Sequence, residues 1–402
     1  MMKIVSIRSV KRAYSFLHII LYKFKQLYNQ KYNSVTLKLI PDEDTITWKT
    51  ERLFSGGYVH IKIPRAIGIT SGGEFSAYHP ESHVLKIENC SQFVASDVIR
   101  VGDKALFYKV KRHQSNKEIF GDADLLEYTA DSVTVDAGSK EIHVGAAFSL
   151  LGVNSSHWAH FLVEYLPKLL YCRTELESVG RLVIEKTIDE HVHALIHEVL
   201  PQNVEIIEVE KKTRCIFEKM LYCMPVAYLC NHAEYSILND TVIPESTRTI
   251  LRSTLVSVAD KINSQSDNYK LHRNIYIAFQ GGRGPVNAAE IEGFFRGIGY
   301  LVVHPHKICF EEKVRIFSNA KNVVGVGSSG FANILFNGGS VKVLMFMNYE
   351  RQFDTYFSQL TTEYPEHQIC YLIGRRVGIW GINSTYYLGV DEIKNAMREM
   401  NF

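Results

Sequence analysis

The chain has 402 residues, 46% hydrophobic and 22% charged, which excludes a disordered or fibrous protein and allows two to three globular domains. The formal net charge of +2 is unevenly spread, because residues 1–31 carry seven Lys or Arg and no acid, leaving −5 on the rest. The net negative charge of residues 32–402 argues against general nucleic-acid binding, which needs basic residues spread over the binding surface.

Residues 1–31 form a basic leader whose apolar side chains recur at spacings of three and four. Its longest apolar run, residues 16–22, is far shorter than the roughly 20 residues that cross a bilayer. Basic residues follow this run and no small-residue cleavage site does, which argues against a signal peptide. The pattern predicts either a peripheral membrane helix at the inner face or a helix that packs on the protein.

The seven cysteines form no CxxC pair, and no secretion signal precedes them. We therefore expect buried thiols in a reducing cytoplasm, without a disulfide framework. No run of residues has convincing zinc-ligand spacing, so the sequence predicts neither a metal site nor a cofactor.

Residues 32–145 are predicted as a β-rich section, because short apolar runs alternate there with turns. The candidate strands are residues 35–40, 45–48, 58–63, 83–89 and 105–110. Residues 146–245 then alternate helices and strands, which predicts an N-terminal Rossmann-like unit with a parallel sheet. Its strands are expected at residues 181–186, 204–210 and 219–223, and its helices at 157–172 and 188–200.

A polar connector follows, in which residues 246–262 are expected to form a helix. Residues 265–375 then show the clearest alternation of strands and helices and are predicted as a C-terminal Rossmann-like unit. The expected strands are 274–279, 300–304, 322–326, 341–346 and 368–373, and the expected helices 287–297, 310–319, 329–337 and 351–360. This order predicts a doubly wound sheet. We expect an α/β protein whose two Rossmann-like units face each other across a ligand cleft, with residues 376–402 packing back as a tail.

The first of two glycine-rich turns in the C-terminal unit contains Gly281, Gly282 and Arg283, before a helix that Asn287 opens. Glycines let backbone N–H groups approach a phosphate, and Arg283 can hold its oxygens in a fork. The glycine order matches neither a dinucleotide site nor a P-loop, which disfavours NAD and ATP. An ordinary turn remains the alternative.

The second turn contains Ser328, Ser329 and Gly330, and Asn333 follows in the next predicted helix. A serine that caps this helix would create another anion site on the same sheet edge. Two neighbouring anion sites fit a diphosphate, and a plain strand-to-helix turn explains the pattern equally well.

The segment that begins at Asn154 carries the candidate chemistry of the first unit. On a helix, His157, His160 and Glu164 share one face, and a histidine beside a carboxylate can serve as a general base with an orienting partner. Asn154 and His157 stand at the start of this segment. The alternative is a purely structural His–Glu pair, in which the two side chains satisfy each other's hydrogen bonds on a buried helix.

Residues 160–169 (HFLVEYLPKL) resemble the HWxxExLPRL segment of the glycosyltransferase 61 family. Further blocks at residues 276–287, 310–320 and 323–336 resemble the YISR…RxxxN, FxEQxxxFxxA and GxHGAGLTNLLF blocks of that family, in the same order. The resemblance covers about residues 150–350. Within it, the residues that match are His160, Glu164, Arg283 and Asn333.

The sequence departs from the family at five positions. Phe279 replaces Arg, Gly327 replaces His, Ser328 replaces Gly, Lys313 replaces Gln, and His306 stands where an acid is common. These departures leave open a catalytically degenerate relative that binds glycan or helps to assemble a capsule complex.

The resemblance implies a GT-B architecture and an inverting, metal-independent transfer of a hexosyl or pentosyl group in capsule or other surface polysaccharide synthesis. The donor would be a nucleotide sugar, and the acceptor a glycan or a lipid-linked glycan. Glu164 or His160 would take the acceptor proton, and Asn154 and His157 would lie on the acceptor side. Arg283 and the two turns would stabilise the leaving diphosphate. A metal-dependent transferase that uses the DxD pattern of Asp122 and Asp124 is the other alternative, although these residues also fit a solvated turn.

Overall fold

The computed structural model describes residues 34–41, 43–68, 73–108, 122–129, 131–136, 140–186, 188–229, 241–265, 272–279, 284–351, 355–360, 368–377 and 384–402. The predicted leader at residues 1–31 lies outside these ranges, and so do Gly281, Gly282 and Arg283 of the first glycine-rich turn. Within these ranges, no helix is both long enough and apolar enough to cross a membrane.

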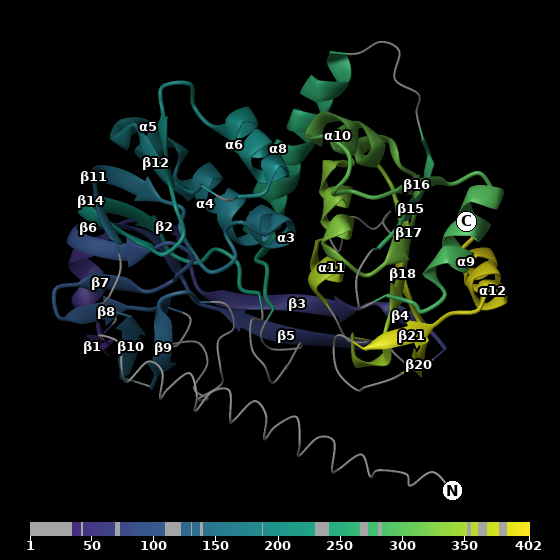
Figure 1. Cartoon of the computed structure of the whole chain (residues 1–402), viewed down its shortest axis with the longest axis horizontal. Coiled ribbons are helices and arrows are strands. Elements are labelled where there is room, and N and C mark those ends of the chain that lie inside the picture. Colours follow the sequence, from purple (N-terminus) through teal and green to yellow (C-terminus); the bar gives the residue numbers. More distant parts are fainter. Residues whose placement is uncertain are drawn as a thin grey trace, which may run out of the picture.

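Two large sheets with helices between them build the molecule (Figure 1). Along the larger sheet the strands run β13-β12-β11-β14-β6-β7-β8-β1-β10-β9, and β2 also pairs with β6. The bounds of its strands are β1 Ser34–Leu39, β2 Lys49–Phe54, β6 Ser82–Phe93, β7 Ile99–Val101, β8 Lys104–Leu106, β9 Leu125–Tyr128, β10 Ser132–Asp136, β11 Lys140–Ser149, β12 Arg181–Glu185, β13 Glu205–Val209 and β14 Thr213–Cys223.

The predicted β-rich section and the first α/β unit share this one sheet. Strands β11 to β14 pair in parallel, as the alternation of strands and helices predicts. Strand β6 then pairs antiparallel with β14, with Ile87 opposite Met220. The apolar runs locate β1, β6, β12 and β13 of this sheet, but only the pairing shows that the two sections are continuous.

Short helices connect the strands of the first unit. They are α3 Trp158–His160, the π-helical turn η2 Phe161–Tyr165, α4 Leu166–Tyr171, α5 Arg173–Val179 and α6 Glu190–Val199. The apolar stripe of α6 is buried, and Asp189 caps the helix by accepting a hydrogen bond from the backbone N–H of His191 at 2.9 Å. The long helix α8, Glu245–Ser264, then leads toward the second unit.

The second sheet is parallel throughout, in the order β16-β15-β17-β18-β19-β4. Five of its strands lie where the sequence predicts them: β15 Asn274–Ile277, β16 Leu301–Val303, β17 Asn322–Val326, β18 Lys342–Met347 and β19 Gln368–Ile373. The sixth, β4 at Arg65–Ile67, comes from the β-rich section and pairs with residues 370–372. This pairing is non-local, so local patterning could not reveal it.

Helices α9 Ala288–Gly297, α10 Phe310–Asn319, α11 Tyr356–Gln359 and α12 Val390–Glu399 accompany this sheet. The tail packs on the sheet, because Tyr386, Ile393 and Met397 share a buried apolar cluster with Tyr276 and Phe295. The remaining named elements are two hairpins, β3 Gly57–Ile63 with β5 Gly73–His79 and β20 Arg375–Val377 with β21 Thr385–Tyr387, and the turn η4 Tyr349–Arg351.

Two predicted elements are wrong in type. Residues 45–48 belong to the 3₁₀ helix η1, Glu43–Trp48, instead of a strand, because a run of four residues is too short for its periodicity to decide. Residues 329–337 form the 3₁₀ helix η3, Ser329–Phe336, instead of an α-helix. All residues from Gly330 to Phe336 are buried, so the run lacks the alternation of apolar and polar residues from which a helix type can be predicted.

The two units meet in a shared hydrophobic core between the sheets (Figure 1). Phe310, Val314 and Phe336 of the second unit join the same buried cluster as Trp158 and Leu251. Hydrogen bonds cross the same boundary: the Tyr356 hydroxyl donates to the carbonyl of Ala159 at 3.0 Å. The units are therefore packed directly against each other at this place.

Candidate active site

The candidate base pair lies on the helical segment that follows β11. The Nδ1 atom of His160 is 2.7 Å from Oε2 of Glu164, as expected for residues four apart on one helical face. The imidazole side chain is 29% exposed and the carboxylate 6%, so the pair reaches from solvent into the protein. A hydrogen bond from Nδ1–H to the carboxylate orients both groups.

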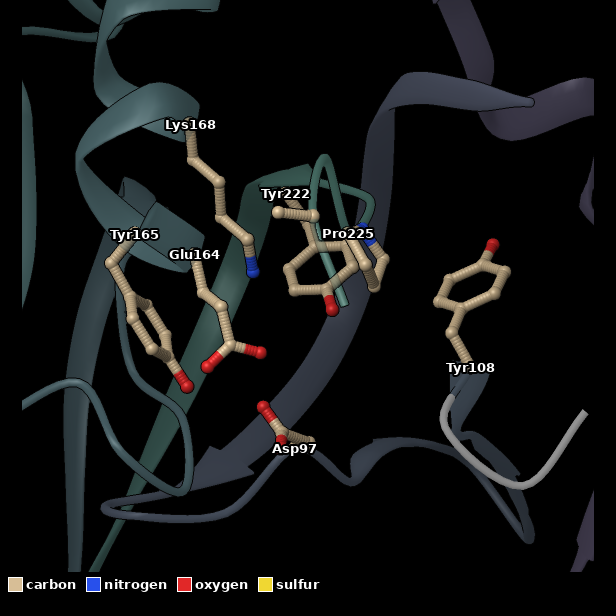
Figure 2. A pocket seen from close by; sticks show the side chains of 8 residues that line it. Asp97, Tyr108, Glu164, Tyr165, Lys168, Tyr222 and Pro225 are labelled. Carbon is tan, nitrogen blue, oxygen red and sulfur yellow. The ribbon is translucent and has the colours of Figure 1, made fainter. Parts of the chain in front are cut away.

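Glu164 also lines a small pocket whose enclosed volume, about 10 Å³, is close to that needed for one water molecule. Figure 2 shows Glu164, Tyr165 and Lys168 entering this pocket from one helical segment, with Asp97 and Tyr222 coming from other parts of the chain. The remaining lining residues are Tyr108, Pro225 and Ala227. A buried carboxylate that faces a hollow of this kind can meet a ligand hydroxyl group.

The predicted acceptor-side residues border this segment. The backbone N–H of Asn154 donates to the Tyr165 hydroxyl at 3.3 Å, which fixes the turn ahead of the helix. The His157 ring is 6.4 Å from the His160 ring, and partial burial lowers the pKa of His157. Both residues therefore lie next to the His160–Glu164 pair.

In the second unit, Ser328, Ser329 and Gly330 lie directly beyond β17, at the carboxyl edge of the sheet. Ser329 is exposed, whereas Gly330 is buried. Ser328 occupies the N-cap position of η3 with the extended backbone usual there, but its side chain makes no capping hydrogen bond, so the predicted serine cap is absent. The exposed start of η3 remains compatible with an anion, but through backbone groups.

Asn333 does not face this edge. It is fully buried, its Oδ1 accepts from Trp158 Nε1 at 2.8 Å, and its Nδ2 donates to the carbonyl of Gly330 at 2.8 Å. The side chain predicted to contact the donor therefore connects the two units, with both ends of its amide occupied inside the protein.

Asn287 has a comparable internal role at the start of α9. Its Nδ2 donates to the carbonyl of Leu388 at 2.8 Å, and its Oδ1 accepts from the Leu388 N–H at 3.4 Å. These bonds attach the C-terminal segment to the second unit, so the structure gives the Asn287 amide a structural function.

Both carboxylates of the DxD pattern are occupied by internal partners. Asp124 is 1% exposed and accepts from Arg100 Nη2 at 3.0 and 3.1 Å. Asp122 accepts backbone N–H groups of Asp97, Asp124 and Leu125 at 3.0 to 3.1 Å, and burial, followed by the nearby charge of Asp97, raises its pKa to about 6. These contacts build the loop around β9.

Position 327, where the sequence departs from the family, is tightly enclosed. A Cβ atom on Gly327 would collide with the sulfur of Met347, and Arg351 Nη1 donates to the Gly327 carbonyl at 3.0 Å. A larger side chain there requires a shift of Met347. The replacement of His by Gly at this position therefore agrees with the packing around it.

A buried polar cluster that the sequence did not reveal lies where the units meet. Lys313 is 2% exposed and its Nζ lies 4.5 Å from the centre of the Trp158 ring, which also packs edge-on against His191. Burial lowers the pKa of Lys313 to about 8, although the carboxylates of Asp189 and Glu190 oppose this shift. The amphipathic pattern of α10 could show burial at position 313, but not its partners.

The described cysteines form no disulfide. Five are buried, as predicted, but Cys309 is exposed just before α10, where the chain leaves the core, so the expectation of burial is wrong there. Cys230 lies outside the residues that the structure describes.

Comparison with known protein families identifies a matching domain within the chain. Residues 158–345 match the model of the family described as Glycosyltransferase 61, and no curated protein matches the chain. The matched range begins at Trp158, includes the His160–Glu164 pair and ends within β18 of the second sheet. It thus spans parts of both α/β units. The chain therefore carries a glycosyltransferase 61 domain.

Proposed function

We propose that this protein transfers a hexosyl or pentosyl group, with inversion, from a nucleotide sugar to a glycan or lipid-linked acceptor in capsule or other cell-surface polysaccharide synthesis. The family match supports sugar transfer in general. The observation that carries the proposal is the His160–Glu164 pair at the wall of a polar pocket.

In this proposal the first unit binds the acceptor and supplies the base. The Glu164 carboxylate takes the proton of the acceptor hydroxyl group as the hydroxyl oxygen attacks the anomeric carbon. His160 positions the carboxylate through its Nδ1–H. Attack from the face opposite the leaving nucleotide diphosphate inverts the anomeric configuration.

The second unit binds the donor in a GT-B-like arrangement of two facing Rossmann-like units. Parallel α/β sheets bind ligands at the carboxyl ends of their strands, where Ser329 and the start of η3 are exposed. Arg283, which lies outside the described residues, is the side chain that would complete the diphosphate site in this proposal. Cationic and backbone N–H groups would stabilise the charge of the leaving group, so the reaction needs no obligatory metal.

The test is a panel of nucleotide sugars with purified full-length protein, measuring donor hydrolysis and transfer in the presence and absence of EDTA. Turnover of one donor that survives EDTA supports the proposal. Activity that disappears with EDTA and returns with a divalent cation supports the metal-dependent alternative. Turnover of no donor contradicts the proposed activity.

A non-catalytic relative is the second candidate, because the Asn333 amide is used internally and a side chain at position 327 would require Met347 to shift. Such a protein would bind glycan or assemble a capsule complex without binding a donor. Isothermal titration with UDP, CMP and GDP separates the two: the absence of binding favours this candidate, and micromolar binding favours the transferase.

A further inference from the structure

We propose that the outward face of the β3–β5 hairpin binds neutral oligosaccharide chains through the rings of Tyr58 and Tyr78, at a place separate from the His160–Glu164 pair. The class of ligand rests on the proposed transferase function. Both tyrosines precede the family match at residues 158–345, so the family assignment does not cover them.

The hairpin has two faces of different character, because side chains alternate along its strands. On the inner face, Val59, Ile61 and Ala77 are buried in one apolar cluster with Val242. On the outer face all side chains are exposed, in three cross-strand pairs: Tyr58 opposite Tyr78, His60 opposite Ser76 and Lys62 opposite Glu74. The hairpin therefore packs on the protein through its inner face.

The two tyrosines leave a large aromatic area in solvent. Tyr58 is 71% exposed and Tyr78 is 52% exposed, and Tyr58 has the highest exposed fraction among the large hydrophobic side chains that the structure describes. Their rings meet edge to face, with centroids 5.3 Å apart. A cross-strand aromatic pair stabilises a hairpin, but more than half of each side chain remains outside this contact. The pair thus offers surface that the stability of the hairpin does not use.

The hairpin is fixed to the rest of the protein before any ligand arrives. The Ser358 hydroxyl of α11 donates to the carbonyl of Lys62 at 3.1 Å. Strand β3 leads into β4, which pairs with β19 of the second sheet. A Cβ atom on Gly56 would collide with the Tyr78 hydroxyl, so a glycine there leaves room for this ring. A surface held in this way loses little conformational entropy on binding.

Exposed tyrosines suit the chemistry of a sugar chain. The face of an aromatic ring carries partial negative charge, against which the C–H groups of a sugar ring can pack. The tyrosine hydroxyl groups lie at the wet end of each ring, where they can donate to and accept from sugar hydroxyl groups. One pair of side chains therefore provides both kinds of contact that a neutral sugar offers.

The charges of the outer face favour a neutral polymer over an anionic membrane or a nucleic acid. Lys62 and Glu74 are the acid and the base on this face of the two strands, and their ion pair at 3.6 Å leaves no net charge. His60 and Ser76 form a hydrogen-bonded pair at 2.9 Å between them and the tyrosines. Anionic lipids and phosphate backbones are attracted by an excess of basic groups, which this face lacks.

The position of the hairpin suits a chain that also reaches the candidate active site. Figure 1 shows β3 and β5 running along one side of the molecule, from the first sheet toward the second. Helix α11 contacts the hairpin through Ser358 and the segment of the candidate base through Tyr356, whose hydroxyl donates to the carbonyl of Ala159. The hairpin is therefore linked through one short helix to the residue that precedes His160.

Ligand-observed NMR with full-length protein, without any donor, tests this inference. The probes are maltohexaose, cellohexaose and N-acetylchitohexaose, which are neutral hexasaccharides. We expect at least one of them to bind, and Tyr58→Ala and Tyr78→Ala each to weaken that binding about tenfold. Tyr58→Phe keeps the ring and should stay within threefold of wild type. The affinity should not change as salt rises, because the ligand is neutral.

Tyr349→Ala is the matched control, since Tyr349 is a 48% exposed tyrosine of the second unit. It should leave hexasaccharide affinity within threefold of wild type. If no hexasaccharide binds, or if Tyr58→Ala and Tyr78→Ala behave like this control, the inference is wrong. A lower melting temperature with unchanged sugar affinity would show that the pair only stabilises the hairpin. If Tyr58→Ala fails to fold, Tyr78→Ala on the opposite strand decides.

Co-sedimentation with vesicles of phosphatidylglycerol and phosphatidylethanolamine separates a sugar site from a membrane contact. Tyr58→Ala and Tyr78→Ala should bind these vesicles as the wild type does. If both variants lose vesicle binding while no hexasaccharide binds the wild type, the tyrosines contact lipid and the inference is wrong.

Kinetics distinguish this inference from the proposed function. With an active donor, Tyr58→Ala should raise the KM for a long acceptor about tenfold, and leave kcat and the KM for a monosaccharide acceptor within threefold. An unchanged KM for the long acceptor contradicts the inference while leaving the transferase intact. If the wild type turns over no donor, the proposed function fails, and the hexasaccharide titration still decides whether the tyrosines bind sugar.

Discussion

At the scale of single residues, Glu164 carries the proposed chemistry. Glu164→Gln keeps the shape of the side chain and removes the proton acceptor, so we expect transfer to fall about 10²- to 10⁴-fold. Nucleotide affinity and the melting temperature should stay near wild type. The measurement is single-turnover transfer, together with isothermal titration of the nucleotide.

His160→Asn is the paired variant, because it retains a hydrogen-bond donor toward Glu164 and removes the imidazole. A loss smaller than that of Glu164→Gln supports His160 as a positioning residue. If His160→Asn loses more activity and Glu164→Gln stays within threefold of wild type, the roles of the two residues are exchanged.

Lys313 illustrates the cost of a buried charge. Its pKa in the folded protein is about 8, below the ordinary value of 10.5, so the unfolded chain binds more protons between these pH values. The buried charge of Lys313 therefore lowers the free energy of unfolding by its full amount below about pH 8. This loss becomes smaller as the pH rises toward 10.5. Lys313→Met should raise the free energy of unfolding at pH 7 by about 1 to 3 kcal/mol.

Urea unfolding at pH 7 and pH 10 checks this prediction. The difference between Lys313→Met and wild type should shrink at pH 10, where Lys313 is neutral in the folded protein. Lys307→Met, at an exposed lysine of the preceding loop, should differ from wild type by less than about 0.5 kcal/mol at both pH values. A difference that does not change with pH would show that packing, instead of charge, sets the effect.

At the scale of elements, the attachment of the C-terminal segment depends on Asn287. Asn287→Ala removes both hydrogen bonds to Leu388, so we expect the free energy of unfolding to fall by about 1 to 3 kcal/mol. Hydrogen exchange in α12 should accelerate more than exchange in α6. If nucleotide affinity falls while α12 stays protected, Asn287 binds the donor instead.

Local patterning predicted the helices and strands best where each element is long and its apolar residues are periodic. Strands β15 to β19 and the helix α8 lie where their apolar runs place them. The helix face that joins His160 and Glu164 was also predictable, since four-residue spacing is a local property. Residues 45–48 and 329–337 could not be assigned correctly, because a four-residue run and an entirely buried run carry no usable period.

At the scale of the whole molecule, Trp158 and Asn333 connect the two units. Trp158→Phe leaves the buried Oδ1 of Asn333 without its donor, so we expect a loss of about 1 to 3 kcal/mol in the free energy of unfolding. Asn333→Ala should cost a similar amount. A double-mutant cycle should give a coupling of at least about 0.5 kcal/mol, and additive losses would contradict the connection.

The basic leader, residues 1–31, is predicted to bind the protein to anionic membranes. Removing residues 1–31, with their seven basic side chains, should abolish binding to anionic vesicles while the fold and transfer to a soluble acceptor persist. Vesicle co-sedimentation at rising salt checks this, since screening weakens exposed charge pairs. A truncated chain that unfolds, or that still binds vesicles, would show that the leader does not act as a membrane anchor.

The sequence by itself determined the order of most elements, the alternation that produces parallel sheets, the resemblance to glycosyltransferase 61 and the His160–Glu164 pair. All of these depend on neighbours within a few residues or on blocks in a fixed order. The tertiary structure alone decided that β4 joins the second sheet, that Asp124 pairs with Arg100 and that Asn333 binds Trp158. Packing also brought Asp97 next to Glu164, because contacts between distant segments depend on how buried surfaces fit together, and no local spacing encodes that fit.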